Sequence, residues 1–257
     1  MTILRWRPLA ASATGASHAR AGACNADAQR FAPYGEGGLA LLVADGLGSA
    51  PEAPLAAHAA VALAARSLRA AAPAGRPGRA AALAGQRDDV RAAVLAARSG
   101  LHGLGAVLDR PVADLGTTLL VCVLSDAGAT FGGVGDGFLA IRARLPGGDH
   151  RHHLLTLTAP GPFANETETL GSGAPIVVEM IDDPDIDGVA LATDGFEAAA
   201  VERPLATDRA LRTGLIDALL SHADGAEDSA ALHRDILAAD WDRAAADDRS
   251  IVMAVNR

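Results

Sequence analysis

The sequence predicts an α+β fold in a single domain that spans residues 1–257. Short apolar segments typical of strands come in groups separated by Gly-rich turns, and Ala-rich helical segments come in pairs. The length fits one large domain or two small ones, and neither an internal repeat nor a long linker divides the chain. We therefore expect the strands and helices to form one unit.

The first half of the chain combines two strands with two helices. Residues 4–13 resemble a short strand interrupted by a proline, and a Gly- and Ala-rich loop is expected to follow up to about Gly38. Leu39–Ala44 is a continuous apolar run that ends at Asp-Gly, which predicts a buried strand. Ala-rich residues 52–72 predict a helix, and Pro and Gly residues separate it from a second helix at about 86–108.

The second half of the chain is dominated by strands. Hairpin signals (Ser-Asp-Ala-Gly, Gly-Asp-Gly and Pro-Gly-Gly) separate several short apolar runs, which predicts an antiparallel meander. The expected strands are 117–124, 129–134, 138–145, 152–157, 176–181, 189–192 and 250–255. Apolar residues at helical spacing predict a helix over 207–222, and another is expected over about 228–240.

The composition excludes several functional classes. The formal net charge of −9 argues against duplex nucleic acid or an anionic membrane as a general partner. All 22 basic residues are Arg. The sequence therefore excludes phosphate-binding P-loops of the usual kind, kinase strand lysines and Schiff-base sites, because each of these needs a lysine. With two cysteines, no signal-peptide pattern and no segment long enough to span a membrane, we expect a cytoplasmic protein.

Two polar clusters are not interpreted as functional sites. His150, His152 and His153 are expected to lie on a solvated turn, because they lack the spacing of metal ligands. Asp183, Asp185 and Asp187 approach the pattern of a helix–loop–helix calcium loop, but the segment before them is typical of a strand. We expect this acidic run to form a solvated loop.

The aspartates at strand ends are more informative. Asp45, Asp136 and Asp194 each end an apolar or Gly-rich run and precede Gly, and Asp247 lies just before the last strand. Carboxylates from several segments of a rigid sheet are ligands that hard divalent cations prefer. Asp-Gly is also a common hairpin turn, which is the preferred explanation for Asp136 alone. For Asp45 and Asp194, the residues alone favour neither a hairpin turn nor a metal site over the other.

Taken together, these segments resemble the metal-dependent protein phosphatases of the protein phosphatase 2C family, and the opening Ser-His is similar to a divergent bacterial branch. The resemblance rests on six stretches in the family's order, which span about residues 12–255. They are Gly15-Ala-Ser-His18 with Asn25-Ala-Asp27-Ala28, Leu42-Val-Ala-Asp45-Gly46-Leu-Gly-Ser49, Thr117-Thr118-Leu119, Gly133-Val-Gly-Asp136-Gly137, Ala192-Thr-Asp194-Gly195 and Asp247-Asp-Arg-Ser-Ile-Val252. The resemblance implies a four-layer αββα sandwich of two antiparallel sheets flanked by helix pairs.

The resemblance also implies a mechanism and ligand roles. Two Mn²⁺ or Mg²⁺ ions would activate a water molecule that attacks phosphorus in line, without a phosphoenzyme. Asp45 would bridge the two ions and the Gly46 carbonyl would bind one of them. Asp194 and Asp247 would hold the other ion, and Asp136 matches a position that helps to bind a weaker third ion. Asp27 would orient the attacking water.

Three positions depart from the family pattern. Ala26 stands where the family has Glu or Gln, so one ion loses a ligand. The phosphate-binding Arg of the family aligns with Gly22, and Arg20 would share its face if the segment is extended. Leu47 replaces a His that protonates the leaving group in many members, and His18 is the candidate substitute. The alternative for Arg20 is a surface position, and the alternative for His18 is a structural role.

These departures leave two functional hypotheses. The first is a phosphoserine/phosphothreonine protein phosphatase, monomeric, acting on protein substrates of a serine/threonine kinase. It would cleave aryl phosphates faster than phosphopeptides if the acid is missing, because phenolates leave without a proton. The alternative is a catalytically weak or inactive phosphatase-like scaffold that binds a protein or phosphoprotein partner. Metal binding distinguishes the two hypotheses, because an inactive scaffold that has lost its metals should not bind Mn²⁺.

Overall fold

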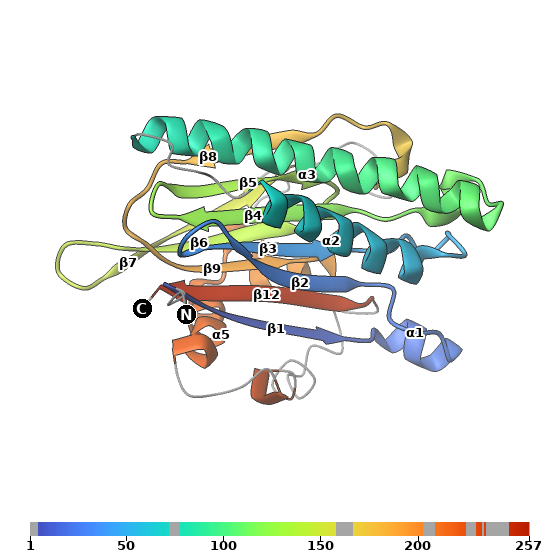
Figure 1. Cartoon of the computed structure of the whole chain (residues 1–257). Coiled ribbons are helices and arrows are strands. Elements are labelled where there is room, and N and C mark those ends of the chain that lie inside the picture. The colour runs from blue at the N-terminus through green and yellow to red at the C-terminus, as the bar shows by residue number, and fades with distance from the viewer. Residues whose placement is uncertain are drawn as a thin grey trace.

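The structure of the chain is a computed structural model. It describes residues 5–71, 78–157, 167–202, 209–224, 230–232, 234 and 247–256. Two five-stranded antiparallel sheets dominate it (Figure 1). Sheet I has the order β2 (Ala28–Tyr34), β3 (Gly38–Ala44), β4 (Leu119–Ser125), β5 (Gly128–Val134) and β8 (Val177–Ile181). Sheet II has the order β1 (Trp6–Ala13), β12 (Arg249–Asn256), β9 (Ile186–Ala192), β6 (Phe138–Arg144) and β7 (His150–Thr156).

Helices cover the outer face of each sheet. Helices α2 (Ala53–Ala70) and α3 (Arg79–Leu108) lie side by side on sheet I, and α5 (Thr213–Asp224) lies on the far side of sheet II (Figure 1). Many buried residues of α2 are alanines, whose small side chains allow close packing on the sheet and on α3. The predicted four-layer αββα sandwich is therefore confirmed.

Strand β3 shows why these strands have continuous apolar sequences. Its even-numbered residues, Ala40, Leu42 and Ala44, pack with α2 and α3, whereas the odd-numbered residues between them face the core between the sheets. Since side chains alternate along a strand, a strand buried on both faces needs apolar residues throughout. All seven residues of β3 are buried.

Most predicted elements are confirmed, with corrected boundaries. Helix α3 begins at Arg79, earlier than expected, and α5 begins at Thr213, later than expected. Of the expected helix at 228–240, residues 230–232 and 234 are described and helical, and the remainder lies outside the described residues. The short elements η1 (Val112–Leu115), η2 (Leu170–Ser172), η3 (Asp194–Phe196), α4 (Glu197–Ala200), β10 (Val201–Glu202) and β11 (Ala210–Leu211) were not predicted.

The expected loop up to Gly38 was wrong. This segment contains α1 (Ala16–Ala21) and the edge strand β2. Helix α1 has six residues and none of them is buried, so its sequence carries no amphipathic pattern. Strand β2 contains Pro33 and alternates buried with exposed positions, which suits the edge of a sheet but resembles a loop in sequence.

The histidines expected on a solvated turn lie on a strand, whereas Asp183 and Asp185 lie in the predicted loop between β8 and β9. His150 and His152 lie on β7, where they contact Asp187 and Asp217 respectively. Asp187 is buried, and its carboxylate accepts hydrogen bonds from Arg142 and Arg144. Asp187 is therefore occupied by ion pairs within sheet II, which agrees with the rejection of a calcium loop.

Within the described part of the chain, the helices are all too short or too polar to cross a lipid bilayer.

Candidate functional site

Three of the predicted metal ligands converge at one end of the sandwich. Asp45 directly follows β3, Asp194 begins η3 after β9, and Asp247 lies just before β12. Strands β9 and β12 pair antiparallel, which brings the end of one beside the start of the other. A cavity of about 270 Å³ is lined by Ser17, His18, Asp45, Gly46, Leu47, Gly48, Thr118, Thr167, Thr169, Asp194 and Asp247.

The carboxylates of this cavity crowd one another. Burial, together with the nearby charges of Asp27, Asp194 and Asp247, raises the pKa of Asp45 to about 11. Burial also raises the pKa of Asp194, and the nearby charges of Asp136 and Asp247 add to this shift. Carboxylates this close together oppose each other's ionisation unless positive charge lies between them. The site therefore fits a cation.

Two buried oxygen atoms support the same conclusion. Asp27 is 4% exposed, and its Oδ2 accepts a hydrogen bond of 2.9 Å from the Thr193 hydroxyl. Its Oδ1, like Oδ1 of Asp194, is buried without a hydrogen-bond partner among the described residues. Burial, followed by the neighbouring charges of Asp248 and Asp194, raises the pKa of Asp27 to about 7. A bound metal ion or water molecule would provide the partner that these buried oxygens lack among the described residues.

The turn at Asp45 and Gly46 is held by backbone contacts. The Asp45 carbonyl accepts hydrogen bonds from the Thr118 amide at 2.8 Å and the Thr117 hydroxyl at 2.9 Å, and its amide donates to the Thr118 hydroxyl. A Cβ at Gly46 would lie 2.6 Å from the Ala26 carbonyl oxygen, so only Gly fits there. The Thr117-Thr118 motif therefore positions the Asp45-Gly46 pair.

Asp136 lies beside the cavity and not among its lining residues. Its Oδ2 accepts a hydrogen bond of 2.8 Å from the hydroxyl of Thr167, which does line the cavity. The charge of Asp136 contributes to the raised pKa of Asp194, so the two carboxylates are near neighbours. The role of Asp136 in a weaker third metal site therefore stays a prediction.

The structure separates the two candidate catalytic residues of α1. His18 lines the cavity, whereas the Arg20 guanidinium donates to the Ala16 carbonyl of its own helix at 2.9 Å. The proposed placement of Arg20 assumed an extended segment, and this assumption was wrong because residues 16–21 are helical. Arg20 does not line the cavity, and neither does any other arginine among the described residues.

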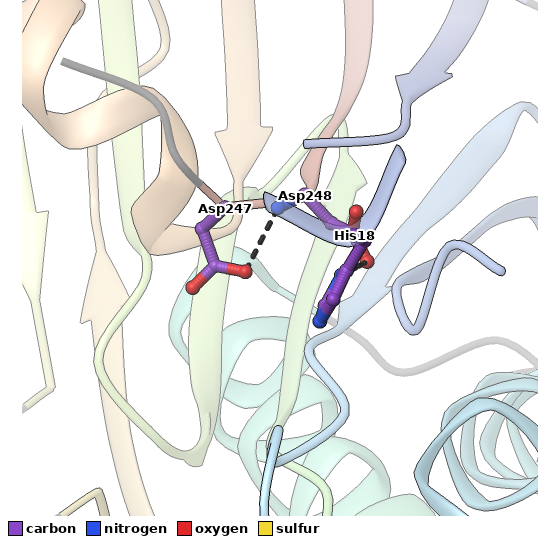
Figure 2. Close-up of side chains that lie close together, drawn as sticks. All are labelled: His18, Asp247 and Asp248. Carbon is purple, nitrogen blue, oxygen red and sulfur yellow. Dashed lines mark hydrogen bonds and ion pairs between the residues drawn. The ribbon is translucent and has the colours of Figure 1, made fainter. Parts of the chain in front are cut away.

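Asp248 is the residue that sequence reasoning missed. Its carboxylate is 2% exposed and accepts hydrogen bonds from the Gly15 amide (2.7 Å), the Ala26 amide (2.6 Å) and His18 Nδ1 (2.9 Å). Figure 2 shows it beside His18 and Asp247, whose Oδ1 accepts from the Asp248 amide. The paired aspartates before the last strand were the only signal, and nothing local separates their roles.

Substitution of Gly195 tests how closely the backbone segments beside the cavity approach each other. A Cβ at this position in η3 would lie 1.9 Å from the Asp248 carbonyl oxygen, so the Asp194 turn or the start of β12 must move. The Gly195→Ala variant is expected to lose about 1–3 kcal/mol of unfolding free energy. Thermal unfolding followed by circular dichroism should show a melting temperature several degrees lower.

The matched control for this variant is Gly214→Ala in α5, where a Cβ meets no atom within 4 Å. Because Ala favours a helix over Gly by up to about 1 kcal/mol, this control should be neutral or slightly stabilising. A Gly195→Ala protein as stable as the wild type would contradict the tight approach.

Comparisons with known proteins identify a family for the sequence and related structures for the fold. The family model "Protein phosphatase 2C" matches residues 14–238, whereas no curated protein matches the chain. Several bacterial phosphatase structures share the fold. A Mycobacterium tuberculosis serine/threonine phosphatase (PstP/Ppp) is 18% identical with a TM-score of 0.63, covering 98% of this chain and 99% of that one.

Two further structures are similar over nearly their whole length. A serine/threonine phosphatase from S. agalactiae is 15% identical with a TM-score of 0.64, covering 98% of this chain and 100% of that one. The phosphatase Stp1 from Staphylococcus aureus is 13% identical with a TM-score of 0.62, covering 100% and 96% respectively. Because the family model covers most of the chain and the fold agrees, this chain belongs to the protein phosphatase 2C family.

Proposed function

We propose that this chain is a metal-dependent phosphatase that hydrolyses phosphoserine and phosphothreonine in proteins phosphorylated by serine/threonine kinases. The proposal is carried by the convergence of Asp45, Asp194 and Asp247 on one cavity. Family membership supports the same chemistry, and bacterial proteins of this fold are named serine/threonine phosphatases.

The residues present fit a centre for Mn²⁺ or Mg²⁺. Asp45 and the Gly46 carbonyl would hold one ion, and Asp45 with Asp194 and Asp247 would hold the second. Asp136 would contribute to a weaker third site. When bound, the ions supply Lewis acidity, which lowers the pKa of water and offsets the charge of the phosphoryl group. Hard oxygen ligands drawn from rigid strand ends suit both metals.

Asp27 is suited to orienting the attacking water. Thr193 holds Oδ2 of Asp27, and the Thr193 hydroxyl also accepts from the Ser250 amide at 3.0 Å, so the carboxylate is anchored to sheet II. The buried Oδ1 atom remains to accept a hydrogen bond from water. A carboxylate held in this way provides the alignment that an in-line attack requires.

The substrate phosphoryl group meets few positively charged groups in this cavity. Among the described residues that line it, His18 is the one side chain that can carry positive charge. His18 is also placed to protonate the leaving oxygen, because Leu47, at the position where many relatives have an acid, has no proton to give. We therefore assign leaving-group protonation to His18.

The function is tested by titrating the purified protein with Mn²⁺ and Mg²⁺ and measuring release of phosphate from p-nitrophenyl phosphate and from a phosphoserine peptide. Turnover should rise saturably with metal and disappear with EDTA. We expect the aryl phosphate to be cleaved faster, because its phenolate leaves without protonation. A protein that binds no Mn²⁺ in calorimetry and releases no phosphate would instead be a scaffold.

The role of His18 predicts a selective loss. The His18→Ala variant should lower kcat on a phosphoserine peptide by about 10²-fold or more, as expected for removal of a general acid. On p-nitrophenyl phosphate kcat should change by less than about threefold, because that leaving group needs no proton. Steady-state kinetics with both substrates measures the difference.

The control is His102→Ala, since His102 is an exposed residue on the surface of α3. This variant should match the wild type on both substrates. Equal losses on both substrates in the His18→Ala protein would show that His18 does not protonate the leaving group.

A further inference from the structure

The hydrogen bonds of Asp248 connect three separate parts of the site. Its Oδ1 accepts from the Gly15 amide, and its Oδ2 accepts from both the Ala26 amide and His18 Nδ1. Gly15 precedes α1 and Ala26 precedes Asp27, so one buried carboxylate holds the chain on both sides of His18. The Asp248 amide also donates to Asp247, which ties this arrangement to the start of β12.

Hydrogen bonding, and not apolar packing, positions α1. The helix has no buried residue and no side-chain cap at its N-terminus. His18 reaches a buried partner, whereas the hydrogen bond that Arg20 makes among the described residues stays within the helix. Loss of the Asp248 contacts would therefore leave His18 with little to fix its orientation.

The same contacts determine which nitrogen of His18 faces a ligand. A carboxylate can only accept hydrogen bonds, so Nδ1 of His18 carries the proton that Asp248 accepts. The other nitrogen, Nε2, has no hydrogen-bond partner among the described residues, and His18 lines the cavity. In Figure 2 this second ring nitrogen lies at the end of the ring away from Asp248. Nε2 is therefore the atom available to the substrate.

An amide at position 248 could not make the same contacts. Asn has one acceptor oxygen and one amino group, whereas all three partners of Asp248 are donors. Whichever way the amide is turned, its amino group would face at least one N–H group. Asp248→Asn thus removes the contact with little change in side-chain size.

We infer that Asp248 is a positioning residue, which fixes His18 with Nε2 toward the leaving oxygen; this rests on the proposed phosphatase function. As water oxygen bonds to phosphorus, the bond from phosphorus to the serine or threonine oxygen breaks. For this step His18 carries a proton on both ring nitrogens: as the imidazolium it gives its Nε2 proton to that oxygen, and Asp27 takes a proton from the attacking water. The Nδ1 proton of His18 stays in its hydrogen bond with Asp248.

Kinetics of single and double variants test this role. Asp248→Asn should lower kcat on a phosphoserine peptide by about 10–100-fold, the range for partners that orient a catalytic group. Its kcat on p-nitrophenyl phosphate should change by less than about threefold, and KM should stay within twofold of wild type for both substrates. Combined with His18→Ala, it should cause no further loss, because both changes remove the same function.

Two variants separate positioning from general damage. His18→Asn keeps a side-chain N–H that can donate to Asp248 but lacks Nε2, so it should lose peptide hydrolysis as His18→Ala does while retaining wild-type thermal stability. Asp88→Asn, at an exposed ion pair with Arg87, should behave as the wild type. Additive losses in the double variant, or equal losses on both substrates, would overturn the inference.

A spectroscopic measurement makes the test independent of turnover. In ¹⁵N imidazole spectra of the metal-free protein, His18 should show a protonated Nδ1, and this signal should change in Asp248→Asn. A His18 protonated only at Nε2 would overturn the inference by itself. Absence of metal-dependent activity in the wild type, with a protonated Nδ1 in His18, would instead overturn only the proposed function on which the inference rests.

Discussion

Asp45→Asn is expected to lower metal-dependent turnover by at least about 10³-fold on both aryl phosphate and phosphopeptide. Asp45 is the carboxylate that interacts with Asp27, Asp194 and Asp247 together, so it occupies the centre of the charged cluster. Metal ions supply several kcal/mol of charge stabilisation in such reactions, and about 4 kcal/mol corresponds to about 10³-fold in rate. Steady-state assays at saturating Mn²⁺ measure the loss.

The loss should be accompanied by weaker metal binding. Calorimetric titration with Mn²⁺ should show a lower affinity or a missing site in Asp45→Asn, and Asp194→Asn should have the same effect. Asp88→Asn provides a matched change on the exposed face of α3 and should bind metal and turn over as the wild type does. Wild-type activity in Asp45→Asn would show that the cavity is not the catalytic centre.

The sequence predicted the strands that are buried on both faces. Leu39–Ala44 is apolar at every position because α2 and α3 cover one face and sheet II covers the other. The edge strand β2 was missed, since it is half exposed and contains Pro33. Local patterns therefore predicted the centre of each sheet better than its margins.

The candidate site was predicted only in part, for a similar reason. Asp45 and Asp194 stand at the ends of buried strands, where an Asp-Gly pair is visible in the sequence. Asp248 acts on residues more than 200 positions away, and no local pattern encodes such a contact. Arg20 was misplaced because its segment was assumed to be extended, whereas the helix turns its side chain back toward Ala16.

Crowding of the carboxylates lowers the stability of the metal-free fold, and a bound metal would remove this loss. Burial and neighbouring charges raise the pKa values of Asp27, Asp45 and Asp194 above the value of about 3.9 expected in the unfolded chain. The folded metal-free protein then binds more protons than the unfolded chain above about pH 4, so its stability falls as the pH rises. For Asp27 this loss continues to about pH 7, and for Asp45 it extends beyond neutral pH.

We therefore expect the metal-free protein to melt at a lower temperature at pH 8 than at pH 5.5, and Mn²⁺ to raise the melting temperature more at pH 8. Bound metal replaces protons on the same carboxylates, so protons compete with it at low pH. Thermal scans at both pH values, with EDTA or with millimolar Mn²⁺, measure the four temperatures.

The Asp45→Asn variant isolates the contribution of this cluster from the other groups that titrate. Without metal it should be more stable than the wild type at pH 8, by roughly 1–3 kcal/mol, because Asn is neutral without a proton, whereas the buried Asp45 must take up a proton from solution on folding at this pH. Its melting temperature should depend less on pH, and Mn²⁺ should raise it little. A variant that is less stable than the metal-free wild type, with an unchanged response to Mn²⁺, would contradict a metal-binding role for Asp45. The same substitution is thus expected to stabilise the empty fold and to abolish turnover, because the carboxyl group that is costly to bury without metal is the group that binds the metal.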